Sequence, residues 1–260
     1  MNAARRSALL ALCFSLGSLT GCGPSRSALY PAFPEQRKQF GSIGIVMDYL
    51  IIDGLFGDTN KVDIVENKSL AARLLADCSD SLSRKGYPVR MTSLSSMGLL
   101  MKRDKSYKVA QTADARSEDL QIAHPPFFID TLFLPDTILE HLAHVYSSLI
   151  NLPEKRRDVS FVIPEAMPIG KRIDCETIAI VLAGGFNEPV SMGVGKQTAN
   201  GSVTGGIIGL QSVSQLSMLF FVIDARNGEI IWEDRRFMSG GVLYPDKILG
   251  MARELVAELP

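Results

Sequence analysis

The stretch SQLSMLFFVIDARNGEIIWEDRRFM, residues 214–238, contains the strongest fold signal in this chain. Apolar, β-branched and aromatic residues lie on both sides of Asn227-Gly228, and such residues favour β-strands. Asparagine followed by glycine supplies the positive φ angles that a two-residue type I′ turn requires. The stretch therefore predicts an antiparallel β-hairpin that turns at Asn227-Gly228.

Two helices are predicted from their start signals and their apolar spacing. Pro245 and Asp246 are typical of a helix start, and the apolar residues of 246–259 recur at the spacing of one helix face. Asp136 is expected to cap a second helix over 136–150, whose apolar residues have the same period.

The N-terminal half predicts a strand followed by a helix and a second strand. Asn67 or Ser69 is expected to cap this helix, and Gly86 with Pro88 marks its end. Its apolar stripe consists of Leu70, Leu74, Cys78 and Leu82. The strands predicted outside the hairpin cover 42–47, with an extension to residue 52, and 87–91, 159–163 and 177–183.

Residues 93–126 show no clear period, and we expect loops with one or two short helices there. Elsewhere strands and helices alternate, which indicates an α/β fold in which helices pack against a mixed β-sheet, with α+β as the alternative. No internal repeat interrupts the chain, so a single domain over 41–260 is the simplest organisation.

The first residues have the layout of a secretory signal peptide. Arg5 and Arg6 form a basic region, an apolar stretch covers 8–16, and small residues follow. A membrane span needs about 20 consecutive apolar residues, and this stretch is shorter. We therefore expect residues 1–21 to be a signal peptide that is removed.

Leu19-Thr20-Gly21-Cys22 resembles the lipobox of bacterial lipoproteins. The resemblance implies cleavage between Gly21 and Cys22 and a diacylglyceryl group with a further acyl chain on Cys22, whereas the alternative is an ordinary signal peptide with a chance cysteine. Several acyl chains make a lasting anchor. Residues 22–40 would then be a lipidated tether, and Gly23, which is not aspartate, implies sorting to the outer membrane.

Charge and glycine patterns exclude two classes of ligand. The net charge is −1, and the longest basic run is Lys155-Arg156-Arg157, so nucleic-acid binding has little electrostatic support. The glycine-rich segment 183–209 fails the phosphate-loop pattern because Gly195-Lys196 is followed by glutamine. The segment also lacks the third glycine of the dinucleotide pattern, so we expect no nucleotide and no nucleotide cofactor.

Cysteines and histidines give no metal site. Cys13 leaves with the signal peptide and Cys22 is lipidated, so Cys78 and Cys175 remain. These two either form a disulfide, which an exported protein permits, or stay free, with Cys78 as a small buried residue. His141 and His144 lie three residues apart with no signalled third ligand, so we expect an ordinary helix surface rather than a metal site.

The predicted order of elements, with the motif VIDARNGEIIW at 222–232, resembles a group of bacterial envelope lipoproteins. This group includes the curli-secretion lipoprotein CsgG, the penicillin-binding-protein activator lipoproteins and the N-terminal domain of TolB. Their hairpin carries an aspartate, a Thr-Gly or Asn-Gly turn, a glutamate and a β run that often ends in tryptophan. The resemblance implies an α/β domain with no catalytic residues to transfer.

Three function classes follow. The favoured hypothesis is a non-enzymatic accessory lipoprotein, anchored in the outer membrane by Cys22 and facing the periplasm, that binds protein partners of an envelope assembly or its own copies. The alternative is a subunit of a CsgG-like secretion channel, in which 192–215 forms an inserted amphipathic hairpin. The third is a periplasmic hydrolase. The sequence marks no catalytic residues for it, and the G-x-S-x-G elbow of one large hydrolase class is absent.

Overall fold

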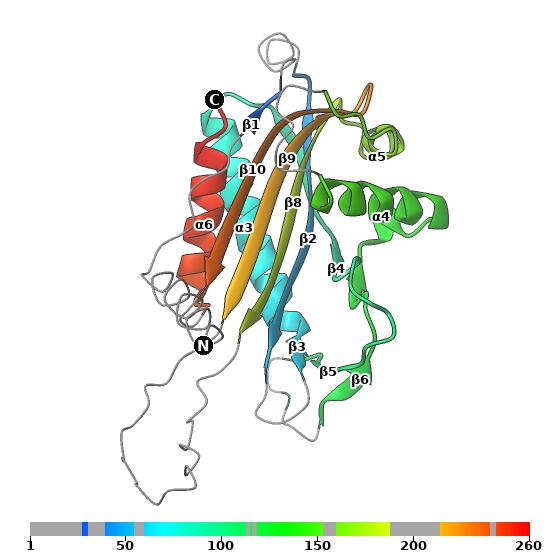
Figure 1. Cartoon of the computed structure of the whole chain (residues 1–260), viewed down its shortest axis with the longest axis vertical. Helices are drawn as coiled ribbons and strands as arrows, with labels where there is room; N and C mark the ends of the chain where they lie inside the picture. Colours follow the sequence, from blue (N-terminus) through cyan, green and yellow to red (C-terminus); the bar gives the residue numbers. More distant parts are fainter. Residues whose placement is uncertain are drawn as a thin grey trace, which may run out of the picture.

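The structure is a computed structural model, and it describes residues 28–30, 40–54, 60–112, 115, 119–152, 160–187, 214–239 and 243–260. Across these residues, ten strands form one mixed sheet in the order β1-β10-β9-β8-β2-β3-β5-β6, with β4 paired to β2 and β7 paired to β4. Four α-helices pack against the sheet (Figure 1). The predicted α/β fold is confirmed.

The bounds of the elements are as follows. The strands are β1 (Ala28–Leu29), β2 (Ile43–Asp53), β3 (Lys61–Asp63), β4 (Val89–Met97), β5 (Tyr107–Ala110), β6 (Gln121–Ala123), β7 (Phe128–Ile129), β8 (Thr177–Asn187), β9 (Gln215–Asp224) and β10 (Glu229–Ser239). The helices are α3 (Ile64–Arg84), α4 (Asp136–Ile150), α5 (Ala166–Ile173) and α6 (Pro245–Ala257), with a 3₁₀ turn, η3 (Thr131–Phe133), before α4.

Strand β2 separates two hydrophobic cores. It runs parallel to both β4 and β8, and its side chains alternate between the two faces of the sheet. Ile45, Met47 and Tyr49 belong to the core beneath α3 and α6, whereas Val46 belongs to the core beneath α4 and α5. Both faces of β2 are therefore buried, which explains its long apolar sequence.

The predicted caps of the first helix are wrong. Helix α3 begins at Ile64, and its N-cap is Asp63, whose Oδ1 accepts a hydrogen bond of 2.9 Å from the Glu66 amide. Asn67 instead lies inside the helix and is 4 % exposed. The predicted end is confirmed, because α3 stops at Arg84 and Gly86 has a φ of +85°.

The expectation of loops with one or two short helices over 93–126 holds only in part, because loops alternate there with strands. Strand β4 continues to Met97, and β5 and β6 follow within the same region. Ser93, Ser95 and Ser96 are buried in β4, because their hydroxyls form hydrogen bonds inside the protein. Buried serines break the apolar alternation that sequence patterns detect.

The predicted hairpin is confirmed as β9 and β10, but its turn is of another type. Among the described non-glycine residues only Asp174 has a positive φ, so Asn227 does not adopt the type I′ geometry. Gly228 has a φ of +78°, and its amide donates to the Asp224 carbonyl at 2.8 Å across a longer turn. One positive φ angle, at glycine, is sufficient for this turn.

The remaining predictions hold in part. The predicted strands at 42–52, 87–91 and 177–183 correspond to β2, β4 and β8, and the helix at 246–259 corresponds to α6. Asp136 is the first residue of α4 rather than its cap, which is Pro135. The described part of 159–163 forms only one β-bridge, between Val162 and Glu229, and the helix α5 that follows was not predicted.

Candidate functional site

A polar cluster lies at an irregularity in β4, between the sheet and α4. The pairing of β4 with β2 shifts after Leu94, so that Ser95 is an extra residue in a β-bulge. The Ser95 hydroxyl donates to the Met47 carbonyl at 2.8 Å and lies 2.6 Å from the hydroxyl of Tyr146 on α4. Ser95 has a single hydroxyl proton, so Tyr146 is the donor in the second bond.

Asp48 is the charged member of this polar cluster. Its Oδ1 accepts a hydrogen bond from the Ser96 hydroxyl at 2.8 Å and another from the Leu99 amide at 3.4 Å. Burial raises the pKa of Asp48, and these hydrogen bonds oppose the rise. Burial, and then the charge of Asp48, hold the pKa of Tyr146 well above its ordinary value, so its hydroxyl stays neutral.

The geometry of the polar cluster favours a structural role. Ser95, Ser96 and Tyr146 are each 0 % exposed, so none of these three hydroxyls reaches solvent. Each also has a partner inside the protein, and a serine nucleophile needs both access and a base that takes its proton. The cluster therefore fixes the bulge and joins β2, β4 and α4.

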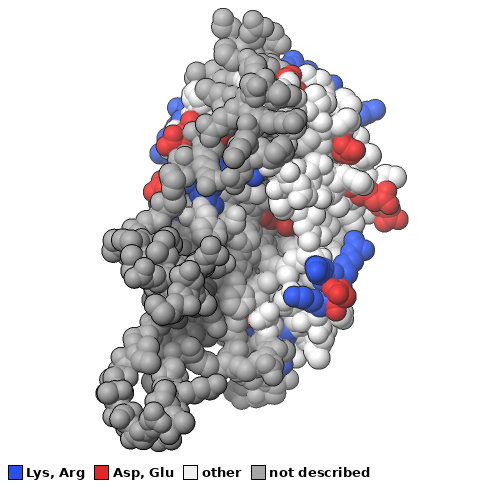
Figure 2. Space-filling view, viewed as in Figure 1, with Lys and Arg blue, Asp and Glu red and all other residues white. Residues whose placement is uncertain are grey.

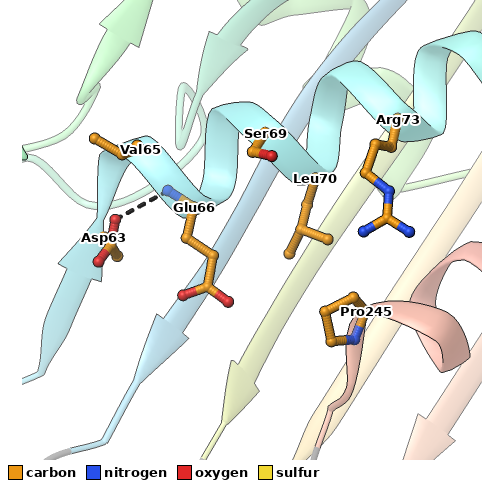
Figure 3. A pocket seen from close by; sticks show the side chains of 7 residues that line it. All are labelled: Asp63, Val65, Glu66, Ser69, Leu70, Arg73 and Pro245. Carbon is orange, nitrogen blue, oxygen red and sulfur yellow. Dashed lines mark hydrogen bonds between the residues drawn. The ribbon is translucent and has the colours of Figure 1, made fainter. Parts of the chain in front are cut away.

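A pocket of about 360 Å³ lies where α3 and α6 begin. Figure 3 shows the side chains of Glu66 and Arg73 extending from α3 toward the side where Pro245 starts α6. Arg73 also lies 3.9 Å from Asp246, in an exposed ion pair between the two helices. The pocket is lined by Asp63, Val65, Glu66, Ser69, Leu70, Arg73 and Pro245.

Two carboxylates, Asp63 and Glu66, line this pocket, and the charge of Asp53 outside its lining also acts on Glu66. Burial raises the pKa of Glu66, and the charges of Asp53 and Asp63 raise it further. Burial also raises the pKa of Asp53, which accepts a hydrogen bond from Asn187 at 3.2 Å. In the described part of the chain, no three acidic, histidine or cysteine side chains are arranged to hold a metal ion.

The structure separates the two cysteines that the sequence left open. Cys78 lies in the core beneath α3 and α6, and Cys175 lies in the core beneath α4 and α5. Both thiols are free, so the disulfide that was considered does not form. The sheet stands between them, which sequence spacing does not reveal.

The structure describes the two predicted histidines but not the predicted lipidation site. Gly21 and Cys22, and nearly all of the glycine-rich segment, lie outside the described residues. His141 and His144 lie on α4, partly buried and exposed respectively. The sequence reasoning missed Asp48 and Tyr146; the cluster of serines before Met97 was the signal that could have indicated a buried polar site.

Comparisons with known proteins identify no family. No protein-family model matches the chain, and no curated protein is similar in sequence. One similar solved structure is the PelC dodecamer from Paraburkholderia phytofirmans, with 10% identity, a TM-score of 0.30 and coverage of 91% of this chain and 93% of that chain. Another is lipoprotein GNA1162 from Neisseria meningitidis, with 12% identity, a TM-score of 0.31 and coverage of 83% and 95%.

Proposed function

We propose that this protein is an outer-membrane lipoprotein that faces the periplasm and acts as a non-enzymatic, partner-binding module of an envelope assembly. The observation that carries the proposal is Leu19-Thr20-Gly21-Cys22, which directly follows a basic region and a short apolar stretch. In the part of the chain that the structure describes, no helix is both long and apolar enough to cross a membrane.

Only residues 23–27 separate the proposed anchor at Cys22 from the first described residues. Ala28 and Leu29, which belong to the predicted tether, pair with Glu233 and Trp232 at the edge of the sheet as β1. Tyr30 is 3 % exposed and contacts Phe161 edge to face, with ring centroids 6.3 Å apart. The predicted tether of 22–40 therefore joins the sheet at residue 28. The short leader that remains between Cys22 and Ala28 supports the proposal that the domain is held near the membrane.

The anchor is tested by replacing Cys22 with serine. We expect the wild-type chain to carry the mass of the diacylglyceryl and acyl groups and to sediment with membranes. We expect Cys22→Ser to lose both properties and to remain folded. A Cys22→Ser chain that stays acylated and membrane-bound would overturn the proposal.

The binding role is tested with the lipidated chain in its membrane. We expect cross-linking in intact cells to capture a defined envelope protein, or further copies of the chain, in amounts comparable to the chain itself. The Cys22→Ser chain is the matched control and should lose this capture. Turnover of a substrate by the purified chain, abolished by one substitution, would contradict a non-enzymatic role.

A second candidate function, a subunit of a membrane channel, is favoured by one observation. The two residues that flank segment 188–213 lie side by side, because the Ser214 hydroxyl donates to the Asn187 side-chain carbonyl at 2.9 Å. An insertion that leaves and returns at paired strand ends could extend the hairpin of β8 and β9. Conductance of the purified chain in a planar bilayer, lost when 188–213 is deleted, would select this function over the accessory one.

A further inference from the structure

Among the described residues, no helix packs on part of the α4 and α5 face of the sheet. Figure 1 shows these two helices beside the upper half of the long strands, with no described helix beside their lower half on that side. Two rows of the sheet there carry side chains toward the same face. We name this region the open face; it consists of Phe237, Ser217 and Gly184 in one row and Ser239, Gln215 and Phe186 in the next.

Exposure increases along the strands toward the open face. In the row that contains Phe221 and Ile180 both side chains are 0 % exposed, whereas Phe237 is 48% exposed. Gly184 and Gln215 are exposed too, and Phe186 is half-buried. The six residues of the open face carry no charge, and Phe237 and Phe186 supply its aromatic surface.

The lipid anchor lies within reach of the open face. Ala28 pairs with Glu233, and six residue steps separate it from Cys22, so the lipid is at most about 21 Å from that point of the sheet edge. Phe237 lies four residues along β10 from Glu233, which is about 13 Å at the rise of a strand. A membrane that holds the lipid is therefore close enough to touch Phe237.

The basic loop between β4 and β5 is an alternative surface for membrane contact. Figure 2 shows a cluster of basic side chains over the loop between β4 and β5, which contains Lys102, Arg103 and Lys105. Strand β5 lies five strands from β10, or about 24 Å across the sheet. This loop is farther from the anchor than the open face is, so the open face meets the membrane first.

We infer that the open face rests on the membrane in which the Cys22 lipid is inserted, with Phe237 and Phe186 in the interfacial layer. The inference rests on the proposed lipid anchor. Phenylalanine is among the apolar side chains that surface-bound proteins bury at the boundary between headgroups and acyl chains, and the absence of charge in the open face removes the cost of burying an ion there. Because the leader between Cys22 and Ala28 is short, the part of the domain near β1 is the part that contacts the membrane.

The inference is tested by fluorescence of a polarity-sensitive label on the lipidated full chain in phosphatidylethanolamine–phosphatidylglycerol vesicles. The label is placed at Phe237→Cys and, as matched controls, at Val65→Cys on the opposite face and at Lys105→Cys in the basic loop. Cys78 and Cys175 are free but buried, so the labelling reagent reaches the new cysteine first. We expect blue-shifted emission and quenching by nitroxide lipid at position 237 alone.

The following results with the acylated chain would overturn the inference. Equal quenching at 65 and 237, or quenching only at 105, would mean that the domain meets the membrane elsewhere. Protection of the 237 label in detergent, with a dimer or larger species in solution, would assign the open face to a second copy. Ser239→Cys gives the same readout if Phe237→Cys does not fold. A chain that lacks the mass of the acyl groups would contradict the proposed lipid anchor rather than this inference, and the mass measurement distinguishes the two.

Discussion

Asn67 takes the place of a strand on one side of β2. Strand β4 pairs with β2 as far as Asp48 and β3 pairs with it at Asp53, so the backbone of Ile51 lies between them. The Asn67 side chain accepts from the Ile51 amide at 2.6 Å and donates to the Ile51 carbonyl at 3.0 Å. This polar residue is buried because it satisfies a strand edge that would otherwise lack partners.

Replacement of Asn67 by leucine should therefore be costly. Two buried backbone groups would lose their partners, and we expect the free energy of unfolding to fall by about 2–4 kcal/mol. Asn151→Leu is the matched control, because its hydrogen bond to the Ser147 carbonyl is exposed and should be worth about 0.5 kcal/mol or less. Urea denaturation measures both; equal losses would contradict the role given to Asn67.

Asp48 should make stability depend on pH. Because its pKa is raised in the folded state, the folded chain binds the proton more tightly than the unfolded chain does. Its stabilising contribution is complete below the unfolded pKa of about 3.9 and is lost as pH rises through the folded pKa. In Asp48→Asn, which keeps the acceptor oxygen, this loss should be absent.

The measurement is urea denaturation of the wild type and Asp48→Asn at a series of pH values from about 4 to about 7. We expect the stability of the variant relative to the wild type to increase with pH over this range. A difference that stays constant, or that changes in the other direction, would show that Asp48 does not carry a raised pKa in the fold.

At the scale of elements, the β9–β10 turn depends on one glycine. A side chain at Gly228 would overlap the carbonyl of Ile163, and its φ of +78° is unfavourable for any other residue. Gly86 has a φ of +85° but nothing within 4 Å of an added Cβ. The two glycines share the backbone conformation and differ in their surroundings.

Alanine at these two glycines should therefore have unequal effects. We expect Gly86→Ala to reduce the free energy of unfolding by about 1–2 kcal/mol through its backbone conformation alone. Gly228→Ala should lose about 1–3 kcal/mol more, because the contact of the turn with Ile163 must open. Thermal unfolding of both variants checks the difference, and equal destabilisation would mean that the Ile163 contact is not important.

The elements that the sequence predicted well are those with a clear apolar pattern. Helices α4 and α6 each have one apolar face, whereas β2 and the β9–β10 hairpin have long apolar runs, and each was identified. The region after Met91 failed because serines, rather than apolar residues, occupy buried positions in β4. The polar cluster was missed because Asp48 and Tyr146 meet only through tertiary packing, and the serines of β4 were the one local signal for it.

At the scale of the whole molecule, the sheet isolates two cores that share β2 and the long strands beside it. Cys78 is 2 % exposed in one core and Cys175 is 7 % exposed in the other. Burial raises the pKa of the Cys78 thiol to about 12, and burial also raises that of Cys175. Each thiol therefore reports on the opening of its own core.

Thiol reactivity tests this arrangement in a Cys22→Ser chain that lacks residues 1–21, in which Cys78 and Cys175 are the only cysteines. Under non-reducing conditions we expect neither thiol to react in the native chain and two thiols per chain to react in guanidinium chloride. Mass spectrometry after alkylation shows which residue reacts. Fewer than two thiols in denaturant would mean that a disulfide exists after all.

The strand order also determines when the molecule can fold. Strand β2 lies near the start of the chain, and its partner β8 follows 134 residues later, from Ile43 to Thr177. Strands β9 and β10, which extend the sheet beyond β8, come later still. Contacts between such distant segments form slowly, because a long loop must close before the strands pair. A chain that passes through a membrane pore with its N-terminus first would therefore stay unfolded until most of its length has emerged.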